Sequence, residues 1–591
     1  MKKTFKKLTS VILAATVGVL SSVSVIPVDA AEEHLLLNVE TDSVSEYGYQ
    51  NYRYVDENGS EVIFEKGEKL FTQSALPSEY DSRDYGYVTD VKYQGGGGNC
   101  WAYSSLSALE TNSIIKGFEN NGTADYSEAH LTWFTGRGLA QDTDDLAYGD
   151  GYNIEEPFYY GGNWKRAAGT LARWSGVADE SEFPADPRNI SSMGNYPESD
   201  RYNTSAGVVL ESAQKLETAN DIKRWIMENG SVTAAFYYSD TYFNKSKYAY
   251  NCPENYSINH MITIVGWDDD FFAGNFRNTP ASDGAWICKN SWGTSWGNGG
   301  YFMISYSDAT VCMTAGFTSR TTDGCYKNYT YNGTEWNSAV GIYGTMQAAN
   351  VFVSGGYEKL NAIGLHTVGS DVKTIIRIYK NIPQNYTNPI AGTLVSTTEK
   401  LIDNEGFHTV YLDDEISLEP GERFSVVVEY KSTLQSATYV PVEKNTVDYQ
   451  SYSSREGESF INYGTSNTGW KPASKANVYN VYIQAFTECN HCISTRNEGL
   501  SCTQDGVEIT YCSQCGKVES EREVYHTGHG FGGWSPFEKN SDGEEISTRA
   551  CYNCGLTETK SHYDVRVVPL NNFIDMFVSR FFIVFRLLFS K

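Results

Sequence analysis

The spacing of hydrophobic and polar residues changes along the chain and divides it into parts. Residues 101–118 repeat with a helical period, whereas 261–267 and 301–306 are compact apolar runs typical of buried strands. Helix and strand patterns mixed in this way predict an α+β domain, which we place at residues 76–319.

A second pattern begins after this domain. Helical periodicity nearly vanishes, and short apolar runs such as 373–379 and 423–430 recur between turns such as Glu419-Pro420-Gly421-Glu422. Regularly spaced short strands separated by turns predict an all-β sandwich, which we place at residues 326–487.

The N-terminal region resembles an export signal followed by a short extension. Four lysines precede an apolar stretch from Leu8 to Leu20, and the small residues of Val28-Asp29-Ala30 follow. This pattern predicts a signal peptide at residues 1–30 and therefore a protein that is extracellular or on the cell surface. Residues 31–75 are too few for a core of their own and are expected to form a short pro-segment or a strand that docks on a later part.

The last residues are rich in Phe, Ile and Leu but are interrupted by charges, so they predict no transmembrane span. We expect an amphipathic tail at residues 570–591, which either packs on a neighbouring domain or contacts a membrane surface. A formal net charge of −27 argues against nucleic acid as a partner, because the phosphate backbone would be repelled.

Cys100 is the candidate nucleophile. It follows the flexible turn Gly95-Gly96-Gly97-Gly98-Asn99 and opens the predicted helix, whose positive end favours a thiolate. Only His130 and His260 are available in this domain as a base, and His260 is preferred because it heads an apolar strand. Asn290, followed by Ser291 and Trp292, offers an amide that can hold the second imidazole nitrogen.

These residues lie in segments that resemble the papain family of cysteine proteases. Fragments of the family pattern occur in the family's order at 76–83, 88–95, 127–128, 161–162 and 290–297, and Gln94 lies six positions before Cys100, which is the family spacing. The resemblance implies a papain-like fold and a cysteine-type endopeptidase that needs no cofactor for catalysis. By residue-by-residue match it assigns catalysis to Cys100, His260, Asn290 and Gln94, and substrate binding to Gly161, Gly162 and Trp292.

The chain also departs from plant and lysosomal members of that family. It has Gly97 where those enzymes carry a bridging cysteine, no cysteine near Tyr160, and a much shorter pro-segment. It resembles instead a bacterial subgroup in which a lectin-like β-domain follows the peptidase. Tyrosines of this β-domain could stack on cell-surface glycans or cell wall, or could simply pack in the sandwich.

Seven of the twelve cysteines are gathered in residues 488–565, where Cys-x-x-Cys pairs recur. Paired cysteines with histidines between them predict zinc-ribbon-like repeats with a structural zinc, although disulfides compete for the same thiols in an oxidising compartment. The expected metal ligands are Cys489, Cys492, Cys512, Cys515, Cys551 and Cys554.

The sequence thus predicts a secreted cysteine endopeptidase acting on protein or peptide substrates, with accessory domains for surface or glycan binding. Two alternatives stay open. One is a surface adhesin with a protease-like scaffold, and the other is a transpeptidase that passes the acyl group to an amine instead of water.

Overall fold

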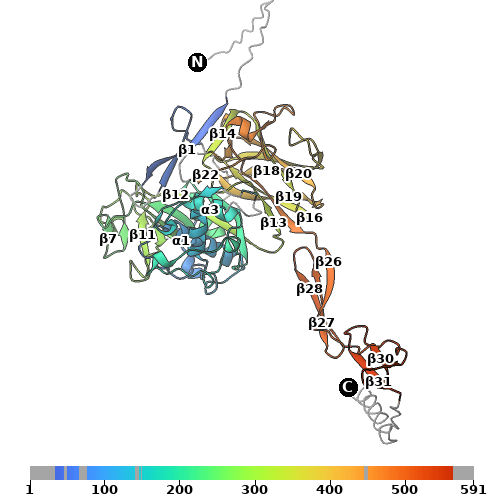
Figure 1. Ribbon diagram of the computed structural model, residues 1–591. Coiled ribbons are helices and arrows are strands. Elements are labelled where there is room, and N and C mark those ends of the chain that lie inside the picture. The colour runs from blue at the N-terminus through green and yellow to red at the C-terminus, as the bar shows by residue number, and fades with distance from the viewer. Residues whose placement is uncertain are drawn as a thin grey trace, which may run out of the picture.

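The computed structural model describes residues 34–44, 50–64, 76–139, 146–147, 150–444 and 450–562. The expected signal peptide and C-terminal tail lie outside these residues. Within the described ranges, no helix is long and apolar enough to cross a membrane. Figure 1 shows a mixed first domain beside an all-β domain, from which a thin C-terminal extension projects.

The described part of the first domain contains four α-helices. The predicted helix at 101–118 ends earlier than expected, because Gly117 adopts a left-handed φ of 73° and its N–H caps the helix on Ile114. Side-chain caps fix the starts of the other three helices, Ser127 at α2, Asn163 at α3 and Thr218 at α4. The helices are α1 (Cys100–Ile115), α2 (Glu128–Gly136), α3 (Trp164–Ala172) and α4 (Ala219–Asn229).

Helices α1, α2 and α3 pack on one another, and α1 also packs on the sheet that forms the other half of the domain. Both predicted strands are confirmed, as β9 and β11. The strands are β3 (Glu79–Asp81), β4 (Gly151–Tyr152), β5 (Val208–Lys215), β6 (Val232–Phe236), β7 (Phe243–Asn244), β8 (Ala249–Tyr250), β9 (His260–Asp268), β10 (Ala285–Lys289), β11 (Tyr301–Ser305) and β12 (Cys312–Thr321).

The second domain is a β-sandwich, as predicted. A six-stranded sheet, β18-β17-β20-β15-β23-β24, packs its apolar side chains against those of β16 and β25 in one buried core. The strands are β13 (Lys327–Tyr329), β14 (Ser338–Tyr343), β15 (Met346–Val353), β16 (Glu358–Thr367), β17 (Val372–Lys380), β18 (Thr393–Ile402), β19 (Gly406–Leu418), β20 (Arg423–Ser432), β21 (Ala437–Val442), β22 (Gln450–Ser451), β23 (Ser459–Asn462), β24 (Lys471–Pro472) and β25 (Ile483–Cys489).

One sheet runs through both domains. Strand β19 of the sandwich pairs antiparallel with β5 of the first domain, from Gly406 opposite Gln214 to His408 opposite Ser212. A Cβ on Gly406 would lie 2.1 Å from the carbonyl oxygen of Ala213, so the close approach requires glycine. The two domains are therefore joined by backbone hydrogen bonds and not only by a linker.

The extension before the first domain docks on the sandwich. Strand β1 (Leu35–Val44) pairs with β14, and β2 (Gln50–Val55) pairs with β1. A buried polar contact joins the N-terminal extension, the first domain and the sandwich. The ammonium group of Lys165 in α3 lies 3.3 Å from Glu405 of the sandwich and donates to the hydroxyl of Tyr54 in β2 at 2.5 Å. The described residues of this region thus include two docked strands, and the pro-segment role of residues 31–75 stays a prediction.

The C-terminal extension consists of two small three-stranded sheets. The first is made of β26 (Ile493–Glu498), β27 (Gly506–Cys512) and β28 (Val518–Val524), and the second of β29 (Glu538–Lys539), β30 (Glu545–Ala550) and β31 (Thr557–Ser561). Figure 1 shows them strung one after the other, away from the two domains.

Candidate active site

Cys100 is the first residue of α1, and its side chain is buried. Its sulfur lies 3.2 Å from the backbone nitrogen of Met261, the second residue of β9. The start of the helix and the start of this strand therefore meet, which places the thiol beside the strand end that carries His260. Its position at the helix N-terminus exposes the sulfur to the positive end of the helix dipole.

His260 is oriented by Asn290. The two strands β9 and β10 are antiparallel, so the first residue of β9 and the residue after β10 lie at the same edge. There His260 Nε2 lies 2.7 Å from Asn290 Oδ1, and the ring stacks on Trp292 with centroids 4.4 Å apart. Burial lowers the pKa of His260 to about 4, and the bond to Asn290 opposes this only in part.

The hydrogen bonds of Asn290 define which imidazole nitrogen carries the proton. The backbone N–H of Ser291 donates to Asn290 Oδ1 at 2.8 Å, which fixes this atom as an acceptor. His260 Nε2 must then be the donor in the neutral ring, and Nδ1 is left with a free lone pair. The ring is thus held in the tautomer with an acceptor at Nδ1, which is the form that a general base requires.

Gln94 lies in the strand-like segment before the glycine turn and is locked in place. Its side-chain oxygen accepts from the Ser291 hydroxyl at 2.5 Å, and its amide donates to the carbonyl of Gly97 at 2.9 Å. Its backbone N–H donates to the Ser291 carbonyl at 2.8 Å. One hydrogen of the amide remains for a further acceptor.

The glycines of this region serve close packing. A Cβ on Gly98 would lie 2.6 Å from the Tyr159 carbonyl oxygen, so the turn before Cys100 can approach that segment only without side chains. Gly161 and Gly162, the expected substrate-binding pair, are buried. A Cβ on Gly162 would lie 2.9 Å from the Trp101 indole, beside the nucleophile, and the Gly161 carbonyl accepts from Arg166 at 2.8 Å.

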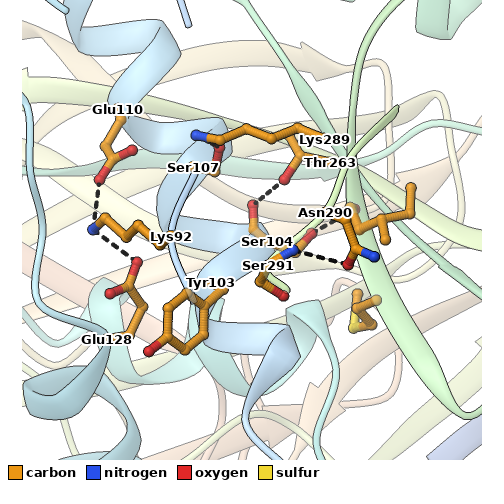
Figure 2. A pocket seen from close by; sticks show the side chains of 12 residues that line it. Lys92, Tyr103, Ser104, Ser107, Glu110, Glu128, Thr263, Lys289, Asn290 and Ser291 are labelled. Carbon is orange, nitrogen blue, oxygen red and sulfur yellow. Dashed lines mark hydrogen bonds and ion pairs between the residues drawn. The ribbon is translucent and has the colours of Figure 1, made fainter. Parts of the chain in front are cut away.

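A charge cluster with two buried carboxylates lies next to these residues, and no motif in the sequence predicted it. Figure 2 shows Lys92 between Glu110 and Glu128, at 3.2 and 2.9 Å from their oxygens. Asp125 lies 2.7 Å from the same ammonium group. Burial opposes the charge of Lys92, but the three carboxylates outweigh it and hold its pKa well above the usual value.

The cluster continues to the residue before Asn290. Lys289 donates to Thr89 at 2.9 Å and to Ser107 at 3.2 Å, and burial lowers its pKa to about 8. Lys289 and Ser107, together with Lys92, Glu110 and Glu128, line a cavity of about 20 Å³, room for one water molecule. Polar contacts thus tie the segments that carry Gln94 and Asn290 to the body of α1.

His130, the other histidine considered as a base, lies elsewhere. Its Nε2 is 2.8 Å from the carbonyl oxygen of Asp200, and its ring contacts Phe134 and Phe183 in the interior. Burial lowers the pKa of His130 to about 4. It is a neutral core histidine, which agrees with the preference for His260.

Replacing His130 with glutamine is expected to make the fold less sensitive to acid. Between its ordinary pKa of 6.5 and about 4, the unfolded chain takes up a proton that the folded chain does not. The stability from the neutral ring is complete above that range and is lost as the pH falls through it. We expect wild type to lose about 1–2 kcal/mol more than His130→Gln between pH 7 and pH 5 in urea unfolding. Equal losses would contradict this.

The C-terminal cysteines form candidate ligand groups that differ in membership from the expected set. All described cysteines are unbridged. Five of the six expected metal ligands fall into two groups, but Cys492 belongs to neither, and His491 stands in its place. Cys502 and His529 complete the second group. Their geometry is described below.

Two known families match the chain in the same order as these domains. The family described as papain family cysteine protease matches residues 76–322, and the family described as lectin like domain matches residues 328–487. The chain contains a papain-family cysteine peptidase domain followed by a lectin-like domain. The positions found for Cys100, His260 and Asn290 lie inside the papain-like domain.

Solved structures share both domains. The clostridial cysteine protease Cwp84 after propeptide cleavage is 25% identical, with a TM-score of 0.60, and the match covers 70% of this chain and 100% of that one. A second structure contains the cysteine protease and lectin-like domains of Cwp84, a surface layer associated protein of Clostridium difficile. It is 24% identical with a TM-score of 0.62, and the match covers 77% of this chain and 99% of that one. This likeness shows a shared fold.

Other relatives share the papain-like domain alone. Macrodontain-1 of Ananas macrodontes is 27% identical over 232 residues, which are 39% of this chain and 89% of the relative. Cathepsin K of Mus musculus is 27% identical over 252 residues, which are 41% of this chain and 63% of the relative. The chain thus spans less than two thirds of cathepsin K.

Proposed function

We propose that the papain-like domain hydrolyses peptide bonds with Cys100 as nucleophile and His260 as base. The observation that carries this is the bond of 2.7 Å between His260 and Asn290, together with the Cys100 sulfur beside the start of β9. A thiol, an imidazole with a free nitrogen and an orienting amide are the groups that nucleophilic acyl transfer needs.

In the first half of the reaction, His260 Nδ1 takes the thiol proton and the Cys100 sulfur bonds to the peptide carbonyl carbon. The imidazolium is stabilised by Asn290 and by attraction to the thiolate. The Cys100 backbone N–H and the free Gln94 amide hydrogen donate to the developing oxyanion. The carbon–nitrogen bond then breaks, and the Nδ1 proton passes to the departing amine.

In the second half, a water molecule gives its proton to Nδ1 and bonds to the thioester carbon. The carbon–sulfur bond breaks, the carboxylic acid leaves, and Cys100 regains its proton. Gly161, Gly162 and Trp292 would form the wall that binds the substrate, and Trp292 would also shield the bond between His260 and Asn290.

The lectin-like domain is proposed to hold the enzyme at a cell surface through glycans or cell wall. The family description supports this, as does the surface-layer association stated for Cwp84. Several tyrosines of this domain are buried in its core, as Tyr430 is. Tyr343 and Tyr411 are exposed and could stack on sugar rings. Export follows from the pattern of residues 1–30.

An epoxide reagent for cysteine peptidases tests the reaction class. We expect one reagent molecule per chain, attached to Cys100 in peptide mass spectra, because burial raises the pKa of the thiols of Cys252, Cys288 and Cys312 and so disfavours their thiolates. Cys100→Ala should remove the label and Cys312→Ala should keep it. A chain that neither binds the reagent nor cleaves peptides would be a scaffold, and products joined to an added amine would indicate acyl transfer.

A further inference from the structure

The C-terminal extension holds two groups of three cysteines and one histidine. Within each group all ligand atoms lie within 4.8 Å of one another. The groups are Cys489, His491, Cys512 and Cys515, and Cys502, His529, Cys551 and Cys554. We propose that each group binds one Zn²⁺ and that each ion clamps two neighbouring units of the chain together.

The distances fit a shared ion. The sulfurs of Cys489 and Cys512 are 3.6 Å apart, and those of Cys502 and Cys551 are 3.7 Å apart. Four ligands at the usual zinc distances of about 2.0–2.3 Å, in a tetrahedron, are separated by about 3.5–3.8 Å. A disulfide would need about 2.05 Å.

The histidines complete both tetrahedra. Cys515 lies 3.4 Å from His491 Nδ1, and Cys554 lies 3.3 Å from His529 Nδ1. Three thiolates and one imidazole leave no open position, so the ions would be structural and would take no part in peptide hydrolysis.

A repeated turn presents two ligands to each ion. In the first group the Gly516 N–H donates to the Cys512 carbonyl at 2.8 Å, and in the second the Gly555 N–H donates to the Cys551 carbonyl at 3.0 Å. Both glycines have a left-handed φ, 78° and 74°. The Cys-x-x-Cys-Gly sequence is therefore one turn used twice, with glycine required at its end.

Cys492 has a different role from the other cysteines of this region. Its sulfur lies 3.8 Å from the carbonyl oxygen of Asn490, outside the first group, whereas its backbone N–H donates to the sulfur of Cys512 at 3.2 Å. Backbone donors of this kind orient a thiolate ligand. An alanine at this position keeps that N–H, which makes Cys492→Ala a matched control.

The first ion would lie at the joint with the lectin-like domain. Cys489 ends β25 and pairs with Glu358 of β16, while Cys512 and Cys515 belong to the first small sheet and its turn. The side chain of Gln514 also joins the two units here. Its Oε1 accepts from the Tyr357 N–H and its Nε2 donates to the Tyr357 carbonyl, each at 2.8 Å.

The second ion would lie at the next joint. Cys502 comes from the connection between β26 and β27 of the first sheet, whereas its three partners come from residues 529–554 of the second. The site is incomplete without Cys502. Units this small need such a clamp, because they have almost no hydrophobic core. In the described residues after Cys489, the buried apolar side chains are three cysteines and Ile509.

Metal analysis of the full chain, purified with Zn²⁺ and dialysed, tests this proposal. We expect two zinc ions per chain in wild type and in Cys492→Ala, and one in Cys502→Ala and in His529→Ala. Limited proteolysis tests the clamp. Cys502→Ala should be cut faster between residues 525 and 535, with cleavage before residue 489 unchanged.

Three results would overturn the proposal. They are loss of an ion in Cys492→Ala, cutting of Cys502→Ala at the wild-type rate, and a metal-free chain whose cysteines are joined as disulfides in non-reducing peptide maps. Unchanged epoxide labelling of Cys100 in each variant would confirm that the papain-like domain stays folded.

Discussion

Replacing Cys100 with alanine is expected to lower kcat/KM for peptide hydrolysis by about 10⁴-fold or more. The reaction needs a sulfur to form the thioester, and no other described thiol lies beside the start of β9. The methyl group of alanine fits the space of the thiol, so the fold should persist. Initial rates on a fluorogenic peptide, with circular dichroism for the fold, measure this.

Cys312→Ala is the control for the loss of a thiol. Cys312 is partly buried on β12, and strand β6 separates it from β9, which carries His260. Its replacement should leave kcat/KM within a few-fold of wild type. Residual activity in Cys100→Ala above about one per cent of wild type would show that another group carries the reaction and would refute the proposed nucleophile.

Replacing Lys92 with methionine is expected to destabilise the papain-like domain by about 3–5 kcal/mol. The substitution removes the cation that lies 3.2 Å from Glu110 and 2.9 Å from Glu128, both of them buried. Two carboxyl groups would then share the interior without their common partner, and one would have to take up a proton. Urea unfolding followed by tryptophan fluorescence measures the change.

Lys245→Met is the matched control. Lys245 pairs with Asp240 at 2.9 Å, but both side chains are largely exposed, so its loss should cost less than about 1 kcal/mol. If the two variants were equally stable, the buried cluster would not hold the domain together. Because Lys92 precedes Gln94 by two residues, Lys92→Met should also lower kcat at temperatures where the domain is folded.

The sequence predicted the reacting groups because they depend on short stretches of chain. Cys100 follows a glycine turn at a helix start, and His260 heads an apolar strand. Asn290 is followed at once by the serine and tryptophan that support it. These features are set by neighbours along the chain. In the structure His260 lies 2.7 Å from Asn290 and the Cys100 sulfur lies beside the start of β9, and the catalytic roles of the three residues stay predictions.

The sandwich and the α+β domain were also predictable, because strand and helix periods are local. The pairing of β19 with β5 was not, since it joins residues 406–408 to 212–214 across almost two hundred positions of sequence. The pairing of β1 with β14 could not be predicted from the sequence for the same reason, because a strand pattern does not specify which sheet edge the strand will pair with.

Residue pattern by itself predicted the candidate residues of the papain-like site, and it determined the order of the two domains and the cysteine-rich end. Only the tertiary structure decided that Lys92, Glu110 and Glu128 share one buried cluster, and that His491 replaces Cys492 among the candidate ligands. The physical reason is common to both cases. A buried charge or a ligand group is defined by distances between atoms, and only the folded backbone brings those atoms together.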